Sequence, residues 1–213
     1  MFSAGAFWIQ QNTGFETSLV NRDEITDSDG EVCGFDLDSE SFLDYVPIQT
    51  TTTRQEASHT WGVELNYRQS FDFAEGFWGD FGVDTNYAYS PSTSSDLDFY
   101  GEALPGTGNS EHQTNVSLWY EAGGIQARIA HNYRGKMFNG VKYEGDYRFA
   151  YWTAPTNYLD ASFSFEFSER YKVSLQATNL TEEYIETYHQ WEKNVDGTYF
   201  YERRVTLGFQ ANL

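Results

Sequence analysis

Alternation of apolar and polar residues runs through much of the chain and is clearest in its last fifteen residues. In residues 199–213 apolar side chains take every second position, and only Arg203 interrupts their face. A strict period of two predicts a β-strand with one apolar and one polar face. We therefore expect an all-β, antiparallel architecture of about eight strands. The other seven are expected at residues 3–10, 57–71, 78–90, 112–121, 125–134, 157–168 and 171–187.

The connections between these strands alternate between long and short. Bacterial outer-membrane barrels have short periplasmic turns and long external loops, whereas a soluble sandwich gives no reason to separate loop lengths in this way. We therefore expect a transmembrane β-barrel in which every long loop is external. The long connections are residues 12–56, 91–111, 135–156 and 188–198, and the short ones are 72–76, 121–124 and 168–170.

Charged residues recur on the polar faces of the expected strands. Such side chains cannot face lipid, but they suit an aqueous lumen or contact with a separate domain inside it. The predicted lumen-facing residues are Glu64, Arg68, Asp84, Arg128, Asp160, Glu166, Lys172 and Arg204.

Composition supports a barrel in a membrane. Aromatic residues make up 18% of the 213 residues, yet the mean hydropathy is −0.61. A lipid-facing band with aromatic girdles, a polar interior and long polar loops reconciles these two values. No apolar run approaches the ~18 residues of a membrane-spanning helix. The net charge of −19 disfavours nucleic-acid partners, which require a positive surface.

The first long loop carries a large share of the negative charge. Residues 12–56 contain eleven acidic residues against Arg22 and Arg54. Residues 27–31, Asp-Ser-Asp-Gly-Glu, suggest a calcium loop, but the ligand offsets of that motif are not met. A solvated acidic loop is the favoured interpretation, with weak divalent binding as the alternative. The single cysteine, Cys33, excludes an intrachain disulfide.

Two short motifs resemble the C-terminal part of TonB-dependent outer-membrane receptors. Residues 179–183, Asn179-Leu180-Thr181-Glu182-Glu183, resemble a signature found one strand before the end of these receptors. Residues 202–213 resemble their final strand, with Arg203 and Leu207-Gly208 in place and Leu213 where an aromatic residue is usual. The first motif also breaks the strand alternation, so a local bulge or bend is the alternative interpretation, and both can be true.

This resemblance implies that the chain is the C-terminal portion of a barrel of about 22 strands with a plugged lumen. The plug domain, the TonB box and a signal peptide are not recognisable in residues 1–213. The implied function is energised uptake, across the Gram-negative outer membrane, of a large nutrient such as a ferric siderophore or a carbohydrate. The implied partners are outer-membrane lipid and lipopolysaccharide, the barrel-assembly machinery, and the TonB complex through the plug.

Aromatic residues in the long loops are the candidate ligand contacts. Aromatic rings stack on sugar rings or on the planar parts of siderophores. The alternative is that these residues form an upper girdle and pack against one another. They are Phe99, Tyr100, Tyr143, Tyr147, Phe149, Tyr151, Trp152 and Trp191.

The sequence shows no motif of an enzyme. Nucleophile elbows, phosphate loops and zinc-ligand spacings are missing, and the four histidines form no metal-ligand pair. We therefore expect no catalytic residues, no cofactor and no metal site. Two other functions remain open: a small, closed eight-stranded outer-membrane barrel with a structural or adhesive role, and a secreted β-sandwich that binds glycans.

Overall fold

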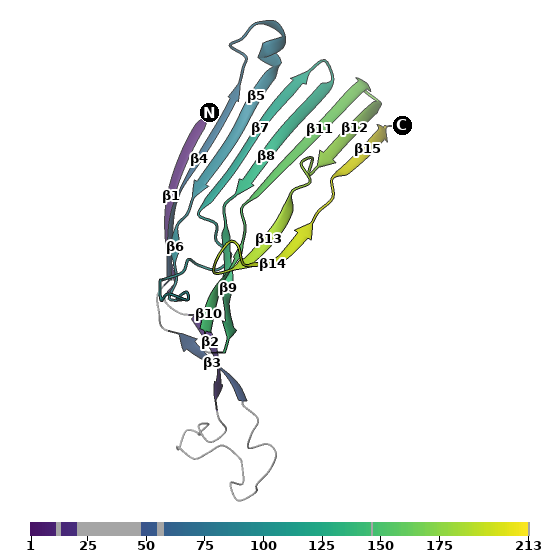
Figure 1. Ribbon diagram of the computed structural model, residues 1–213. Helices are drawn as coiled ribbons and strands as arrows, with labels where there is room; N and C mark the ends of the chain where they lie inside the picture. Colours follow the sequence, from purple (N-terminus) through teal and green to yellow (C-terminus); the bar gives the residue numbers. More distant parts are fainter. Residues whose placement is uncertain (12–13, 21–47, 55–57, 146, 213) are drawn as a thin grey trace, which may run out of the picture. The chain divides into compact units, whose positions relative to one another are not determined.

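The computed structural model describes residues 1–11, 14–20, 48–54, 58–145 and 147–212 (Figure 1). The chain divides into two compact units, one of Met1–Gln10 with Ser58–Leu213 and one of Gln11–Ala57. In the second unit, β2 (Gly14–Val20) pairs antiparallel with β3 (Ile48–Arg54), so the expectation of a continuous loop over residues 12–56 is wrong. Cys33 and the acidic residues 27–31 lie outside the described residues.

The first unit is built on one large antiparallel sheet. Its strands follow the order β1-β4-β5-β7-β8-β11-β12-β15, and the short strand β6 (Ser92–Thr93) pairs with β4. Figure 1 shows the eight long strands side by side. Their bounds are β1 Phe2–Gln11, β4 Ser58–Ser70, β5 Phe81–Tyr89, β7 His112–Ala122, β8 Ile125–Arg134, β11 Thr156–Ser168, β12 Tyr171–Thr178 and β15 Arg204–Ala211.

The eight expected strands are therefore confirmed, with three corrections to their bounds. The expected strand at 78–90 starts only at Phe81, because Gly76–Asp80 forms a short 3-10 helix. The strand at 171–187 is interrupted after Thr178, and the strand at 199–213 is interrupted between Phe200 and Arg204.

A second sheet is formed by the expected loop at 135–156 and by both sides of the expected loop at 188–198. Its four strands have the order β14-β13-β10-β9, and all of their pairings are antiparallel. The expectation of a loop over residues 135–156 is therefore wrong, and the loop expected at 188–198 is shortened to residues 190–194. The bounds are β9 Met137–Glu144, β10 Tyr147–Thr153, β13 Tyr184–His189 and β14 Val195–Phe200.

The apolar face of the eight-stranded sheet is exposed. In register, Leu175 lies beside Phe163 on one side and beside Leu207 on the other, and Leu207 is 74% exposed. The buried apolar side chains of the described residues all lie outside this sheet, in Leu104, Phe138, Ala150 and Tyr188. A contiguous exposed apolar face of this size requires a non-aqueous neighbour. The secreted β-sandwich, whose apolar face would be covered by a second sheet, is therefore wrong.

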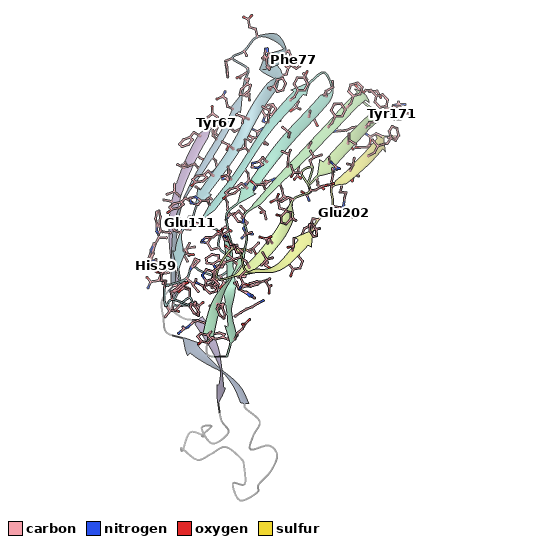
Figure 2. All side chains as sticks on the ribbon, viewed as in Figure 1. His59, Tyr67, Phe77, Glu111, Tyr171 and Glu202 are labelled. Atoms are coloured by element: carbon pink, nitrogen blue, oxygen red, sulfur yellow. The ribbon has the colours of Figure 1, made fainter. Side chains whose placement is uncertain are left out.

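Aromatic side chains mark both ends of this face. At the end with the short connections, Phe81 contacts Tyr120 and Tyr171 stacks on Phe209. At the other end, Trp61 packs edge-on against Tyr89. Figure 2 shows Phe77 and Tyr171 at the first end and His59 at the second.

The spacing of the two aromatic belts fits a bilayer. Ten residues separate Trp61 from Phe71 along β4 and its end. They span ~33 Å along the strand, which corresponds to about 23 Å across a membrane at a tilt of about 45°. The apolar band of outer-membrane barrels is about 25 Å tall.

The eight-stranded sheet is open. In the described part of the chain, β1 pairs with β4 and β15 pairs with β12, and the strand order does not return from β15 to β1. The small, closed eight-stranded barrel is therefore wrong. Backbone groups at open sheet edges cannot be satisfied by lipid, so these two edges require further strands as partners.

The connections keep the predicted alternation in length. Gly123 and Gly124, both with positive φ, close the tight turn between β7 and β8, and the β11–β12 turn has two residues. The terminal residues lie at this same end of the sheet, since Met1 bonds the backbone of Arg68 and Ala211 pairs with Tyr171. Within the described residues, no helix combines the length and apolar character needed to cross a membrane.

Candidate functional site

The four-stranded sheet rests on a small core of its own. Phe138 is fully buried and forms a cluster with Leu104 and Ala150, against which Val141 and Trp152 pack. Leu104 comes from the long connection between β5 and β7, and the Gly108 amide of that connection donates to the Phe138 carbonyl. The three long connections of this unit are thereby held together as one folded body.

Asn179 forms the junction between the two sheets. It has a φ of 54° and is only 6% exposed. Its Nδ2 donates to the carbonyls of Glu183 (3.1 Å) and Tyr201 (2.7 Å), and its Oδ1 accepts from the Glu183 amide (2.8 Å). The side chain therefore bridges the interruption between β12 and β13 to the interruption between β14 and β15.

Other residues of the 179–183 motif complete this junction. Glu182 also has a positive φ and forms an ion pair with Arg203 (3.2 Å). Glu183 Oε1 accepts from the Asn157 amide, and the Leu180 amide donates to the Leu159 carbonyl. Thr181 Oγ1 lies 3.5 Å from the Asn157 carbonyl. The bulge interpretation of this motif is thus confirmed, and it holds together with the family resemblance.

Five of the predicted loop aromatics form one group, which we name the aromatic cluster. Phe99 lies at its centre and stacks on Phe149, with ring centroids 5.5 Å apart and planes 10° apart. Trp191 packs edge-on against Phe99 at 5.8 Å and donates from Nε1 to the Tyr100 hydroxyl (3.3 Å). Tyr147 completes the group at 5.9 Å from Phe99. Residues from three different connections meet here.

Hydrogen bonds of the Gln190 side chain hold together the segments that carry the aromatic cluster. Gln190 Nε2 donates to Asp98 Oδ2 (2.8 Å), and Gln190 Oε1 accepts from the Ala150 amide (3.2 Å). Burial raises the pKa of Asp98, but hydrogen bonds from the Glu102 amide, the Gln190 side chain and the Tyr100 and Gly101 amides lower it below its ordinary value overall. The carboxylate therefore stays charged and keeps its donors in place.

Tyr151 belongs to a separate ionic group. The Lys142 ammonium lies 4.1 Å from the centre of its ring and 3.3 Å from Asp196, and His189 lies 3.4 Å from the same carboxylate. Burial raises the pKa of Asp196, but the hydrogen bond and charge of Lys142, the charge of His189 and a hydrogen bond from Tyr151 lower it overall.

The two remaining loop aromatics lie apart from the aromatic cluster. Trp152 packs on Phe138 with ring centroids 5.3 Å apart, and the Lys136 ammonium lies 4.7 Å from the Trp152 ring. Tyr143 is exposed on β9. The predicted aromatic residues thus divide into the aromatic cluster, the ionic group, one residue against the core and one at the surface.

The predicted lumen-facing residues share the polar face of the eight-stranded sheet. Arg68 pairs with Asp84 (3.3 Å), and Glu166 lies opposite Lys172 in register. Asp160 Oδ1 accepts from the Asn179 amide, so it also supports the junction. The other three residues, Glu64, Arg128 and Arg204, lie opposite Ala88, Trp119 and Thr178. Their contact with a lumen stays a prediction.

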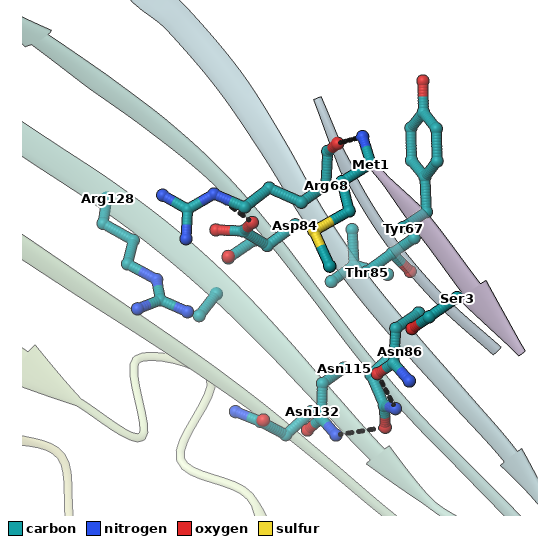
Figure 3. A pocket seen from close by; sticks show the side chains of 14 residues that line it. Met1, Ser3, Tyr67, Arg68, Asp84, Thr85, Asn86, Asn115, Arg128 and Asn132 are labelled. Carbon is teal, nitrogen blue, oxygen red and sulfur yellow. Dashed lines mark hydrogen bonds and ion pairs between the residues drawn. The ribbon is translucent and has the colours of Figure 1, made fainter. Parts of the chain in front are cut away.

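The same face carries a row of amides that sequence reasoning did not single out. Asn66, Asn86, Asn115 and Asn132 lie directly opposite one another on β4, β5, β7 and β8 (Figure 3). They line a hollow of about 380 Å³ together with Ser117, Arg68, Asp84 and Arg128, which we name the amide hollow. Only the register of the hairpins aligns these residues, so a strand-by-strand pattern contains no sign of the row.

Leu207 and Gly208 take opposite faces of β15. Leu207 projects from the apolar face, whereas Gly208 lies opposite Ser174 on the polar face. A Cβ at Gly208 would lie 2.5 Å from Ser174 Oγ, so glycine leaves room for that hydroxyl. Within the described residues, no group of three or more His, Cys, Asp or Glu could hold a metal ion.

Comparison with known proteins gives one finding. The family model described as "TonB dependent receptor-like, beta-barrel" matches residues 9–180. No curated protein and no solved structure matches the chain.

Proposed function

The chain belongs to the TonB-dependent receptor β-barrel family, and we propose that it forms part of the barrel wall of a receptor that takes up a large nutrient. The family consists of outer-membrane receptors and transporters, not of enzymes. Energy for uptake would come from the TonB complex, acting through a plug domain.

The open eight-stranded sheet is the observation that carries this proposal. Its apolar face is exposed between two aromatic belts, its polar face carries charges and amides, and both of its edges need partner strands. A larger closed barrel in the outer membrane meets all three requirements at once. Lipid and lipopolysaccharide would contact the apolar face, and the barrel-assembly machinery would insert it.

A carbohydrate is the nutrient that the aromatic cluster favours. Tyr100 and Tyr147 are more than 60% exposed as residues, and Trp191 is 44% exposed, so a ligand can approach them. Aromatic faces pack well against the apolar faces of sugar rings. The net charge of −19 disfavours the approach of an anionic ligand. A ferric siderophore, the family's commonest cargo, is the second candidate, since planar chelating groups also stack on aromatic rings.

Uptake by cells tests this proposal. Cells that produce the protein from its own gene would receive labelled neutral oligosaccharides from partly hydrolysed polysaccharides, with and without a proton uncoupler. We expect uncoupler-sensitive accumulation, and roughly tenfold weaker ligand binding by Trp191→Ala. Phe200→Ala is the matched control, because Phe200 is exposed outside the aromatic cluster.

Two results would contradict the proposal. Accumulation that persists unchanged after deletion of the gene would exclude the receptor function. Retention of labelled ferric siderophores, but of no oligosaccharide, would replace the proposed ligand by the second candidate.

A further inference from the structure

The amide hollow repeats one functional group at regular steps across the sheet. Asn66, Asn86, Asn115 and Asn132 occupy one register row on four neighbouring strands. Neighbouring strands are ~4.8 Å apart, so the amide groups repeat at about this distance. This is close to the length that one pyranose ring adds to an oligosaccharide.

The amides keep most of their hydrogen-bonding capacity free. Asn86 Nδ2 donates to Asn66 Oδ1 (2.7 Å), and Asn115 Nδ2 lies 3.5 Å from Asn86 Oδ1. Asn132 makes no side-chain hydrogen bond with any residue that the structure describes. Each amide can donate two hydrogen bonds and accept two, so several donors and acceptors face the hollow unpaired.

Ser117 lies in the wall of the hollow. It lines the same hollow and is 4% exposed, yet its hydroxyl has no hydrogen-bond partner among the described residues. A buried hydroxyl without a partner costs free energy. The hydroxyl oxygen is closed to solvent, so it forms part of the wall and is not itself a ligand contact.

The polar groups of the lining favour hydroxyl groups as partners, and Met1, Val116 and Ala130 add apolar surface beside them. Amides and hydroxyls both donate and accept, whereas carboxylates only accept and require cations. The charge of Arg68 is compensated by Asp84 at 3.3 Å. Of the two arginines in the lining, Arg128 has no ion-pair partner among the described residues, and its guanidinium can donate several hydrogen bonds to neutral oxygens.

We infer that the amide hollow is a binding site for a neutral oligosaccharide, separate from the aromatic cluster. The amides of the row hold successive hydroxyl groups, and Arg128 donates to a further oxygen at the edge. The inference rests on the proposed uptake function, since a ligand reaches the polar face only through the barrel. It adds a second site on the path of the ligand along the wall.

Substitution of the unbonded amide tests this inference. The protein, produced from its own gene and purified in detergent, would be applied to an array of immobilised neutral and acidic oligosaccharides, and the affinities would be measured by calorimetry. Asn132→Leu removes an amide that supports no described side-chain bond, so the fold should persist. Gln176→Leu is the matched control, because Gln176 lies on the same polar face outside the amide hollow.

We expect the unsubstituted chain to retain neutral oligosaccharides. Asn132→Leu should weaken binding roughly three- to tenfold, as expected for the loss of one hydrogen bond, and Gln176→Leu should not. Asn115→Leu provides a second variant with the same expected direction. Retention of acidic oligosaccharides alone, of no oligosaccharide, or equal affinities of Asn132→Leu and Gln176→Leu would overturn the inference.

The two proposals fail in different ways. If Trp191→Ala weakens binding while Asn132→Leu and Asn115→Leu do not, the amide hollow is excluded and the receptor function stands. If uncoupler-sensitive uptake is missing although the purified chain binds a neutral oligosaccharide through the amide row, the receptor function fails and the site stands.

Discussion

Replacing Asn179 by alanine removes the side chain that joins the two interrupted strands. Three hydrogen bonds are lost, two from Nδ2 and one to Oδ1, at a residue that is 6% exposed. At about 0.5–1.5 kcal/mol each, they contribute about 2–4 kcal/mol. The φ of 54° adds about 1 kcal/mol for alanine, because its Cβ is strained in this conformation.

Comparison of two variants separates these contributions. Asn179→Gly keeps the positive φ without strain and should lose about 2–4 kcal/mol, whereas Asn179→Ala should lose about 3–5 kcal/mol. Asn194→Ala is the control, since the side chain of Asn194 makes no hydrogen bond with the described residues. The effect should be local, because the strands of the eight-stranded sheet keep their own pairings.

Hydrogen exchange followed by mass spectrometry measures this local effect. Amides of β13 and β14 should exchange roughly 30- to 1,000-fold faster in Asn179→Gly than in the unsubstituted chain. Amides of β7 and β8 should exchange as before. Unchanged exchange in β13 and β14, or equal effects of Asn179→Ala and Asn194→Ala, would refute the assignment of the junction to this side chain.

Two further predictions concern the response of Asp98 to low pH and the packing of side chains around Gly82. Burial raises the pKa of Asp98, but the hydrogen bonds that it accepts lower the pKa below 3.8 overall. These hydrogen bonds therefore stabilise the folded protein above pH 3.8, and this stabilisation is lost as the pH falls further. The near-ultraviolet circular dichroism of the aromatic cluster should therefore change below pH 3.8; a transition complete above pH 5 would be inconsistent. A Cβ at Gly82 would clash with the Trp119 ring, so Gly82→Ala should lower the free energy of chemical unfolding by about 1–3 kcal/mol, whereas Gly5→Ala, with open space around it, should not.

Alternation was sufficient to predict the strands of the large sheet. Each of these strands has one face toward an apolar phase and one toward water, so apolar and polar residues alternate along its sequence. The polar positions included Arg68 and Asp84, which the structure pairs. The same alternation of apolar and polar residues also predicts that one face of the sheet is apolar.

The four-stranded sheet escaped prediction because its strands do not keep a period of two. A register shift falls between Tyr151 and Trp152 and another between Thr187 and Tyr188. Each shift moves the following side chains to the other face. The core around Phe138 is built from short pieces of several connections, so no single segment shows its pattern.

Contacts between segments that are distant in the sequence could not be predicted either. The loop aromatics were predictable as a set, but only the fold separates the Phe99–Phe149 stack from Trp152, which packs on the core. The amide row depends on the register of three hairpins and has no counterpart within one strand.

The orientation of the eight-stranded sheet in lipid can be measured directly with spin labels. Labels at Leu65, Phe163 and Leu207, all on the apolar face, would be compared with labels at Ser162 and Gln176 on the polar face, in membranes that contain the full protein. We predict that lipid-dissolved oxygen broadens the first three and that a water-soluble nickel chelate broadens the other two. Broadening of Leu65, Phe163 and Leu207 by the nickel chelate instead would contradict the assignment of this sheet to a membrane barrel.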